Sequence, residues 1–178
     1  MIRKWLFKEI TDMTDIDFHA TIEYERHTQV INNIKIEFWD LGGTTAFLDR
    51  FVGSKNDISK VIFGDMDTLV YVIDSVEIKD MSQNRMYLNL CLENITKYSP
   101  MATTFILQHK TDLIPMKMRE EVYHTIKDYL FKDITQNLWY YETSMVNTSI
   151  VVATCAVYHA TLGYIPNNVI PEPLTKKT

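Results

Sequence analysis

The sequence predicts an α/β fold with a doubly wound, mostly parallel sheet, and three observations support this. Apolar segments of strand length alternate with longer segments whose apolar residues recur every three or four positions. Residues 69–73 are continuously apolar, which is typical of a parallel strand buried on both faces. One hairpin precedes the alternation, and right-handed crossovers then place helices on both faces of the sheet.

The first part of the chain is expected to form one hairpin and several short helical pieces. Residues 22–31 alternate imperfectly, as a strand does, and residues 34–39 return antiparallel to them. Asn32-Asn33 lies between, and Asn tolerates the positive φ that a tight hairpin turn needs. The other expected segments are the end of a helix in 1–10, a loop in 11–21, and two short helices in 46–64 that break near Gly53-Ser54.

The rest of the chain is expected to alternate strands with helices. Leu88, Cys91 and Ile95 fall on one face of a helix that Pro100 ends. Two similar stripes predict helices that contain Met118, Val122, Ile126 and Tyr129, and Ile150, Ala153, Val157 and Ala160. We expect residues 34–39, 69–73, 104–108 and 138–142 to be neighbouring strands of one sheet.

Composition and charge restrict the class of protein. The 178 residues suit one domain, and 46% hydrophobic with 23% charged residues is typical of a globular domain. A net charge of −5 argues against a nucleic-acid partner, which needs clustered Lys and Arg. The apolar runs are too short for a signal peptide or a membrane span, so we expect a cytoplasmic protein without membrane insertion. Cys91 and Cys155 are expected to be reduced and buried in helices.

The segment from Ile36 to Thr44 is the first candidate for function. Its apolar strand ends at Asp40, where open α/β sheets place their ligands, and Gly42-Gly43 follows at once. The aspartate can hold a metal ion directly or through water. The glycines allow a sharp turn and a close approach of a backbone N–H to an anion.

Two further strands also end in polar residues, and together the three segments resemble a known family. Residues 68–74 end at Asp74, and residues 104–108 lead into His109, Lys110 and Asp112. With the Asp40–Gly43 element, the set resembles the G domain of a small GTPase. His109 replaces the Asn of most small GTPases, and this variant with the WDLGG form resembles the Rag/Gtr family. The resemblance implies a sheet of the P-loop NTPase type, GTP or GDP as ligand, and Mg²⁺.

The resemblance also implies a role for each matching residue. Asp40 would hold Mg²⁺ through water, Gly43 would offer its N–H to the terminal phosphate, and Thr21 would sense both as the switch I threonine. Asp112 would accept two N–H donors from the guanine edge, a pattern that adenine lacks. Lys110 would lie along the base, His109 would bridge the loop to its neighbours, and Ser144 would fall in the last base-contacting loop.

Two departures from the family pattern lead us to expect impaired GTP binding and hydrolysis. The chain contains no GxxxxGK[ST] segment, the loop that supplies the phosphate-binding N–H groups, and we expect the first strand to be missing with it through an amino-terminal truncation. Thr44 stands where the family has the Gln that orients the attacking water. Residues 1–163 would be an incomplete G domain, and residues 164–178 a flexible tail.

The family resemblance further implies a guanine-nucleotide switch in nutrient-linked signalling through the TOR kinase. Protein effectors or a second Rag/Gtr-like subunit would be the partners, and these could hold the chain at the lysosome or vacuole. Two alternatives remain open: an Arf-like GTPase, whose family also uses a WDxGG stretch, and a nucleotide-free interaction module that uses residues 11–21 and 41–64.

Overall fold

The computed structural model describes residues 24–31, 33–51, 57–77 and 81–162. The chain divides into two compact units, residues 1–56 and 57–178, and each is described here by itself. The expected loop at 11–21, which contains Thr21, lies outside the described residues, as do the expected helix end at 1–10, the break at Gly53-Ser54 and the tail at 164–178. The prediction of one G domain over residues 1–163 stays a prediction.

The first unit contains the predicted hairpin. Strands β1 (Tyr24–Ile31) and β2 (Ile34–Leu41) pair antiparallel over their whole length, from Tyr24 opposite Leu41 to Ile31 opposite Ile34. Asn33 has a φ of 65°, the left-handed conformation that Asn tolerates better than most residues. The sequence therefore predicted both the pairing and the chemistry of the turn.

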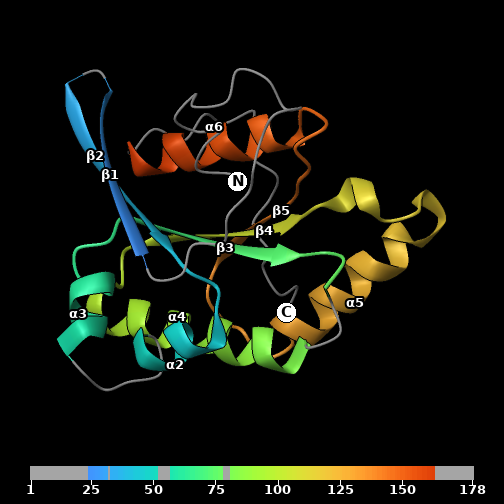
Figure 1. The fold of residues 1–178 in the computed structure, drawn as a ribbon, viewed down its shortest axis with the longest axis horizontal. Coiled ribbons are helices and arrows are strands. Elements are labelled where there is room, and N and C mark those ends of the chain that lie inside the picture. The colour runs from blue at the N-terminus through green and yellow to red at the C-terminus, as the bar shows by residue number, and fades with distance from the viewer. Residues whose placement is uncertain (1–23, 32, 52–56, 78–80, 163–178) are drawn as a thin grey trace. The chain divides into compact units, whose positions relative to one another are not determined.

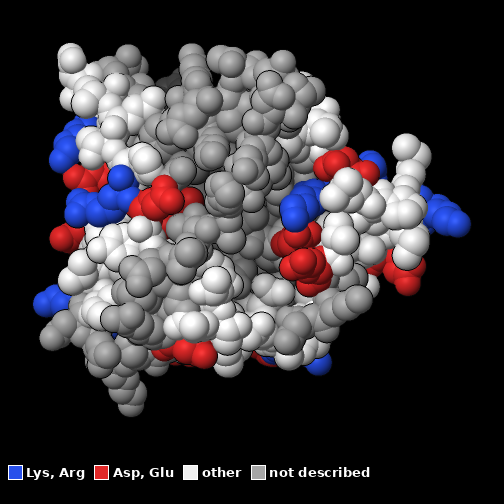
Figure 2. Space-filling model, in the orientation of Figure 1, with Lys and Arg blue, Asp and Glu red and all other residues white. Residues whose placement is uncertain are grey.

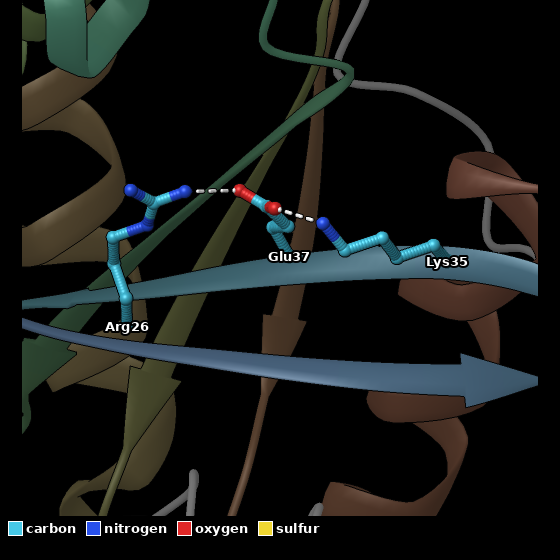
Figure 3. A network of polar contacts seen from close by, with 3 residues as sticks. All are labelled: Arg26, Lys35 and Glu37. Atoms are coloured by element: carbon cyan, nitrogen blue, oxygen red, sulfur yellow. Dashed lines mark hydrogen bonds and ion pairs between the residues drawn. The ribbon is translucent and has the colours of Figure 1, made fainter.

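A polar network lies on one face of this hairpin (Figure 3). The guanidinium Nη2 of Arg26 lies 2.5 Å from Glu37 Oε2, and Lys35 Nζ lies 2.7 Å from Glu37 Oε1. Arg26 also stacks over the Trp39 ring, 4.5 Å from its centroid. The hydrogen bonds from Lys35 and Arg26 lower the pKa of Glu37. Because these side chains are exposed, salt screens their attraction, and the network favours the register only modestly.

Two short helices follow the hairpin, as the sequence predicts. Helix α2 (Thr45–Phe51) belongs to the first unit and α3 (Asp57–Phe63) to the second. Gly64 ends α3 by donating its N–H to Lys60 O at 2.8 Å. A Cβ at this position would come 2.4 Å from the same oxygen, so only glycine allows this close approach.

A parallel sheet forms the centre of the second unit (Figure 1). Its strands, in spatial order, are β3 (Thr68–Asp74), β4 (Thr103–His109) and β5 (Leu138–Glu142). Three longer helices cover it: α4 (Met81–Tyr98), α5 (Arg119–Phe131) and α6 (Ser149–Thr161). Helices α4 and α5 lie on one face of the sheet, and α6 lies on the other. The predicted doubly wound α/β arrangement is confirmed.

The prediction that residues 34–39 lie in the same sheet as the three later strands is wrong. The described strands hydrogen-bond into two sheets, β1-β2 and β3-β4-β5, and β2 pairs only with β1 among them. Side-chain periodicity predicts strands but not their partners, because partners are fixed by contacts between distant segments.

The main core lies between the sheet and helices α4 and α5. Its buried members come from all three strands and both helices, and include Ile73, Leu88, Leu92, Ile106, Ile126, Leu130 and Leu138. The opposite face packs on α6 through Ile150, Ala153 and Ala156. Cys91 is buried and free, but Cys155 is exposed on α6, so the expectation of a buried pair was wrong for Cys155. Among the described residues, no helix is long and apolar enough to cross a membrane.

Candidate functional site

The carboxyl ends of the three parallel strands gather polar side chains at one edge of the sheet. In the register of the sheet, Asp74 lies opposite His109, and Gln108 lies opposite Glu142. Two hydrogen bonds extend this alignment past the strands: Ser75 N to His109 O at 2.9 Å, and Thr143 N to Gln108 O at 2.8 Å. The residues that follow β3, β4 and β5 therefore hold one another in place.

The loop after β4 turns sharply at Lys110. This residue has φ 63° and ψ 32°, a left-handed conformation that costs about 1–2 kcal/mol for a side chain other than glycine. The short 3-10 helix η2 (Thr111–Leu113) follows directly. Thr111 donates both its N–H and its Oγ1 hydroxyl to Thr143 O, at 3.3 and 3.2 Å. These bonds to the end of β5 offset the strain and fix the position of the loop.

Lys110 forms an ion pair across the sheet edge. Its Nζ lies 2.5 Å from Asp74 Oδ2, although the two residues are 36 positions apart in the sequence. Asp74 Oδ1 accepts the N–H of Val76 at 2.9 Å. The pKa of Asp74 is lowered on balance: burial raises it, and the hydrogen bonds from Lys110 and Val76 outweigh the burial. Asp74 is therefore ionised at neutral pH and fixed at both oxygens.

Asp112 lies at the same edge and contacts the loop after β5. Ser144 Oγ donates to Asp112 Oδ1 at 2.5 Å, and Ser144 N donates to Ser149 Oγ at 2.9 Å. The second carboxylate oxygen of Asp112 has no hydrogen-bond partner among the described residues. The carboxylate is half-buried, so it can still accept N–H donors from a ligand while Ser144 fixes its orientation.

His109 is buried behind these residues, with 5% of its surface exposed. Its Nδ1 lies 3.0 Å from Thr143 Oγ1, and that hydroxyl donates its own proton to Gln108 O at 3.4 Å. Nδ1 must then be the donor, which leaves Nε2 as an acceptor, and Nε2 has no partner among the described residues. Burial lowers the pKa of His109, so the neutral ring is favoured.

The residues expected at the phosphate and metal belong to the first unit. Asp40 is half-buried in β2, opposite Glu25, and Gly43 and Thr44 are exposed beyond the end of the strand. Thr44 O accepts the N–H of Leu48 at 2.9 Å, which places Thr44 at the amino-terminal cap position of α2. A Cβ on Gly43 would meet nothing within 4 Å, and its φ is not positive, so the described structure does not itself require glycine there.

The two expected ligands fit the described residues unequally. For a guanine base, the edge offers the acceptor-only Asp112, the stem and charge of Lys110, and the buried bridge through His109. For Mg²⁺, Asp40 is the one expected ligand that is described, and no group of three His, Cys, Asp or Glu residues gathers in the described parts of the chain. Mg²⁺ held through one carboxylate takes its remaining ligands from water and phosphates.

Sequence reasoning missed two residues at this edge and the contact of a third. It noted Asp74 as a strand end without a role, and it did not single out Thr111. It placed Thr143 in the last base-contacting loop but gave its hydroxyl no role. The signal for Asp74 was present, since polar residues that end neighbouring parallel strands share one edge. Nothing in the sequence linked the two threonines to each other.

The fold of the chain is that of a small GTPase. A solved structure of the Arl6 BBS3 small GTPase from Trypanosoma brucei, with a bound nucleotide analogue GppNp, matches 90% of this chain and 90% of its own, with a TM-score of 0.63. Its sequence identity is 14%, so this likeness concerns the fold alone.

The family follows from the sequence comparisons. The Gtr1/RagA G protein conserved region matches residues 1–170, and the chain belongs to this Rag/Gtr family of small GTPases. The GTP-binding protein gtr1 of Schizosaccharomyces pombe is 33% identical over 132 residues, and GTR1 of Saccharomyces cerevisiae is 30% identical over 139 residues. These matches cover 74% and 75% of this chain. The Rag/Gtr resemblance is confirmed.

The matches cover a smaller share of the relatives themselves. This chain spans 40% of the length of the S. pombe protein and 44% of the S. cerevisiae protein. The Ras-related GTP-binding protein B of Rattus norvegicus is 33% identical over 97 residues, which are 25% of its length. The family consists of GTP- and GDP-binding proteins. Because the chain spans less than half of these relatives, its own activity and partners are proposed below.

Proposed function

We propose that this chain is the base-recognising part of a guanine-nucleotide switch of the Rag/Gtr type. The single observation that carries the proposal is the Asp112–Ser144 hydrogen bond of 2.5 Å, at the same sheet edge as Lys110. It fixes a carboxylate whose second oxygen has no partner among the described residues and whose bonded oxygen keeps a further lone pair. Such a carboxylate can accept two adjacent N–H donors, one at each oxygen.

Guanine presents two such donors on one edge, and adenine does not. Asp112 accepts both of them, and Ser144 keeps the carboxylate in the plane of the base. Lys110 lies along the base, and His109 ties the loop to the residue that follows β5. Selectivity follows because an adenine edge would leave the half-buried carboxylate without its partners, which costs binding energy.

The residues that the family resemblance assigns to the phosphates and the metal form a less complete set. Asp40 would hold Mg²⁺ through water, Gly43 would meet the terminal phosphate, Thr21 would sense both, and Thr44 takes the position of the water-orienting Gln. The 178-residue sequence has no GxxxxGK[ST] segment to surround the phosphates with N–H groups. We therefore propose that this chain binds GTP weakly and hydrolyses it slowly.

The proposed cellular role follows from the family. A guanine-nucleotide switch of this type would act in nutrient signalling through the TOR kinase, with protein effectors or a second Rag/Gtr-like subunit as partners. It would be cytoplasmic and peripheral to the lysosome or vacuole. On the face drawn in Figure 2, basic and acidic side chains of the described residues are interspersed, which supports protein partners over nucleic acid.

The test is to titrate the isotopically labelled chain with millimolar guanine and adenine nucleotides and to measure the changes in its amide chemical shifts. We expect guanosine diphosphate to shift Thr111, Ser144 and their neighbours more strongly than adenosine diphosphate does. In Asp112→Asn the amide N–H replaces a carboxylate oxygen, so the preference should move toward xanthosine diphosphate, whose base has an oxygen where guanine has an amino group.

The control is Asp133→Asn, an exposed carboxylate that pairs with Arg85 outside this edge. It should keep the guanine preference. Equal binding of the guanine and adenine nucleotides by the unmodified chain would refute the proposal and favour the nucleotide-free interaction module. Micromolar GTP binding in calorimetry would refute the part of it that concerns the phosphates.

A further inference from the structure

Asp74 is a charged residue at the sheet edge to which the sequence analysis assigns no role. It ends β3, is held at Oδ1 by Val76 N at 2.9 Å, and pairs through Oδ2 with Lys110 Nζ at 2.5 Å. We infer that Asp74 is a positioning residue for nucleotide binding, which acts by holding the Lys110 side chain in place before the base arrives. The inference rests on the proposed function and adds a residue to that site.

The carboxylate is itself rigidly placed. Asp74 is the last residue of β3, and the next residue, Ser75, donates its N–H to His109 O at the end of β4. The Asp74 side chain is 25% exposed, and the backbone N–H groups of Val76 and Glu77 and the Lys110 ammonium are its partners. A charged group anchored to two strands in this way can direct a flexible partner, because it does not move with that partner.

Lys110 is the side chain that needs such direction. It has four rotatable bonds, 40% of its side chain is exposed, and its backbone lies in the left-handed region that begins the loop. Asp74 is the one hydrogen-bond partner of its ammonium among the described residues. Without the carboxylate, the side chain would sample many rotamers, and nucleotide binding would have to order it at the cost of affinity.

The Asp74 carboxylate also has a purely structural contact, and the test must separate its effect from that of the contact with Lys110. Asp74 Oδ1 caps the turn at Val76, and loss of that cap would disturb the loop whatever Lys110 does. Asp74→Asn makes the separation, because the amide oxygen can still accept the Val76 N–H while the negative charge opposite Lys110 disappears. Asp74→Glu keeps the charge on a longer arm and serves as the conservative rescue.

The experiment measures guanosine diphosphate affinity by amide chemical shifts in four forms of the chain: unmodified, Asp74→Asn, Lys110→Met, and both together. Pre-ordering of one long side chain corresponds to about three- to tenfold in affinity, so Asp74→Asn should weaken binding by that factor. In the Lys110→Met background, Asp74→Asn should have no further effect, because its action passes through Lys110. Asp74→Glu should recover part of the loss.

The outcomes separate this inference from the proposed function. If the unmodified chain prefers guanine but Asp74→Asn binds equally well, or if the two losses add in the double variant, the positioning role is wrong and the base site stands. If the unmodified chain has no guanine preference, both are wrong. The distant ion-pair variant Asp133→Asn should leave the affinity unchanged, and a loss there equal to that of Asp74→Asn would refute a specific role for Asp74.

Discussion

His109→Asn should make the folded chain less sensitive to mild acid. The ordinary pKa of histidine, 6.5, applies in the unfolded chain, and burial lowers the pKa of His109 in the folded one. As the pH falls below 6.5, the unfolded chain takes up a proton at this ring and the folded chain does not. The stability that His109 contributes is therefore present above pH 6.5 and is lost as the pH falls toward its folded pKa.

The size of the effect follows from the same difference in pKa. Each unit by which the folded pKa lies below 6.5 contributes about 1.4 kcal/mol. Between pH 7.5 and 5.5 the loss has an upper limit of about 1.4 kcal/mol, which applies when the folded ring takes up no proton over this interval. The structural cause is that Nδ1 already donates to Thr143 Oγ1 and Nε2 has no acceptor among the described residues for a second proton.

The assay is urea unfolding followed by circular dichroism at pH 7.5 and 5.5. Asparagine can retain the bond to Thr143 but does not titrate, so His109→Asn should lose less stability than the unmodified chain over this interval, by up to about 1.4 kcal/mol. Glu142, whose pKa burial raises, acts in the opposite direction but is present in both proteins. His124→Asn changes an exposed ring on α5 and is the matched control.

If the unmodified chain and His109→Asn lose stability in parallel between the two pH values, His109 is not held neutral by burial. The tautomer assigned from Thr143 would then be wrong as well. If His124→Asn shows the same protection as His109→Asn, the effect is one of net charge rather than of this site.

The remaining predictions concern turnover and packing. In a chain extended at its amino end by a strand and a GxxxxGK[ST] loop, Thr44→Gln should speed single-turnover hydrolysis on the order of a hundredfold without a large change in GTP affinity, because the amide can orient the water. No gain in rate at saturating Mg²⁺ would remove Thr44 from the water-orienting position. Ile126→Ala should lower the unfolding free energy by about 2–5 kcal/mol, because Ile126 is fully buried between α5 and the sheet. Val151→Ala, on the exposed side of α6, should stay within about 0.5 kcal/mol, and similar losses in the two variants would refute the described core.

The sequence by itself determined the elements that depend on neighbouring residues. Asn33 suits the hairpin turn, the alternation of apolar residues predicts its strands, and Pro100 follows the end of α4. Residues 104–108 and the polar residues after them predicted a ligand-binding sheet edge, because a strand end and its loop are adjacent in the chain. Family membership followed for the same reason, since the motifs are short and ordered along the sequence.

Only the tertiary structure decided which of these residues act together. Asp74 and Lys110 are 36 positions apart, and Asp112 and Ser144 are 32 apart, yet the parallel register brings each pair into contact. The division into two sheets and the neutral tautomer of His109 were decided at the same level. The physical reason is that a local pattern fixes the direction of a side chain, whereas its partner, its burial and its pKa depend on segments that only folding brings near.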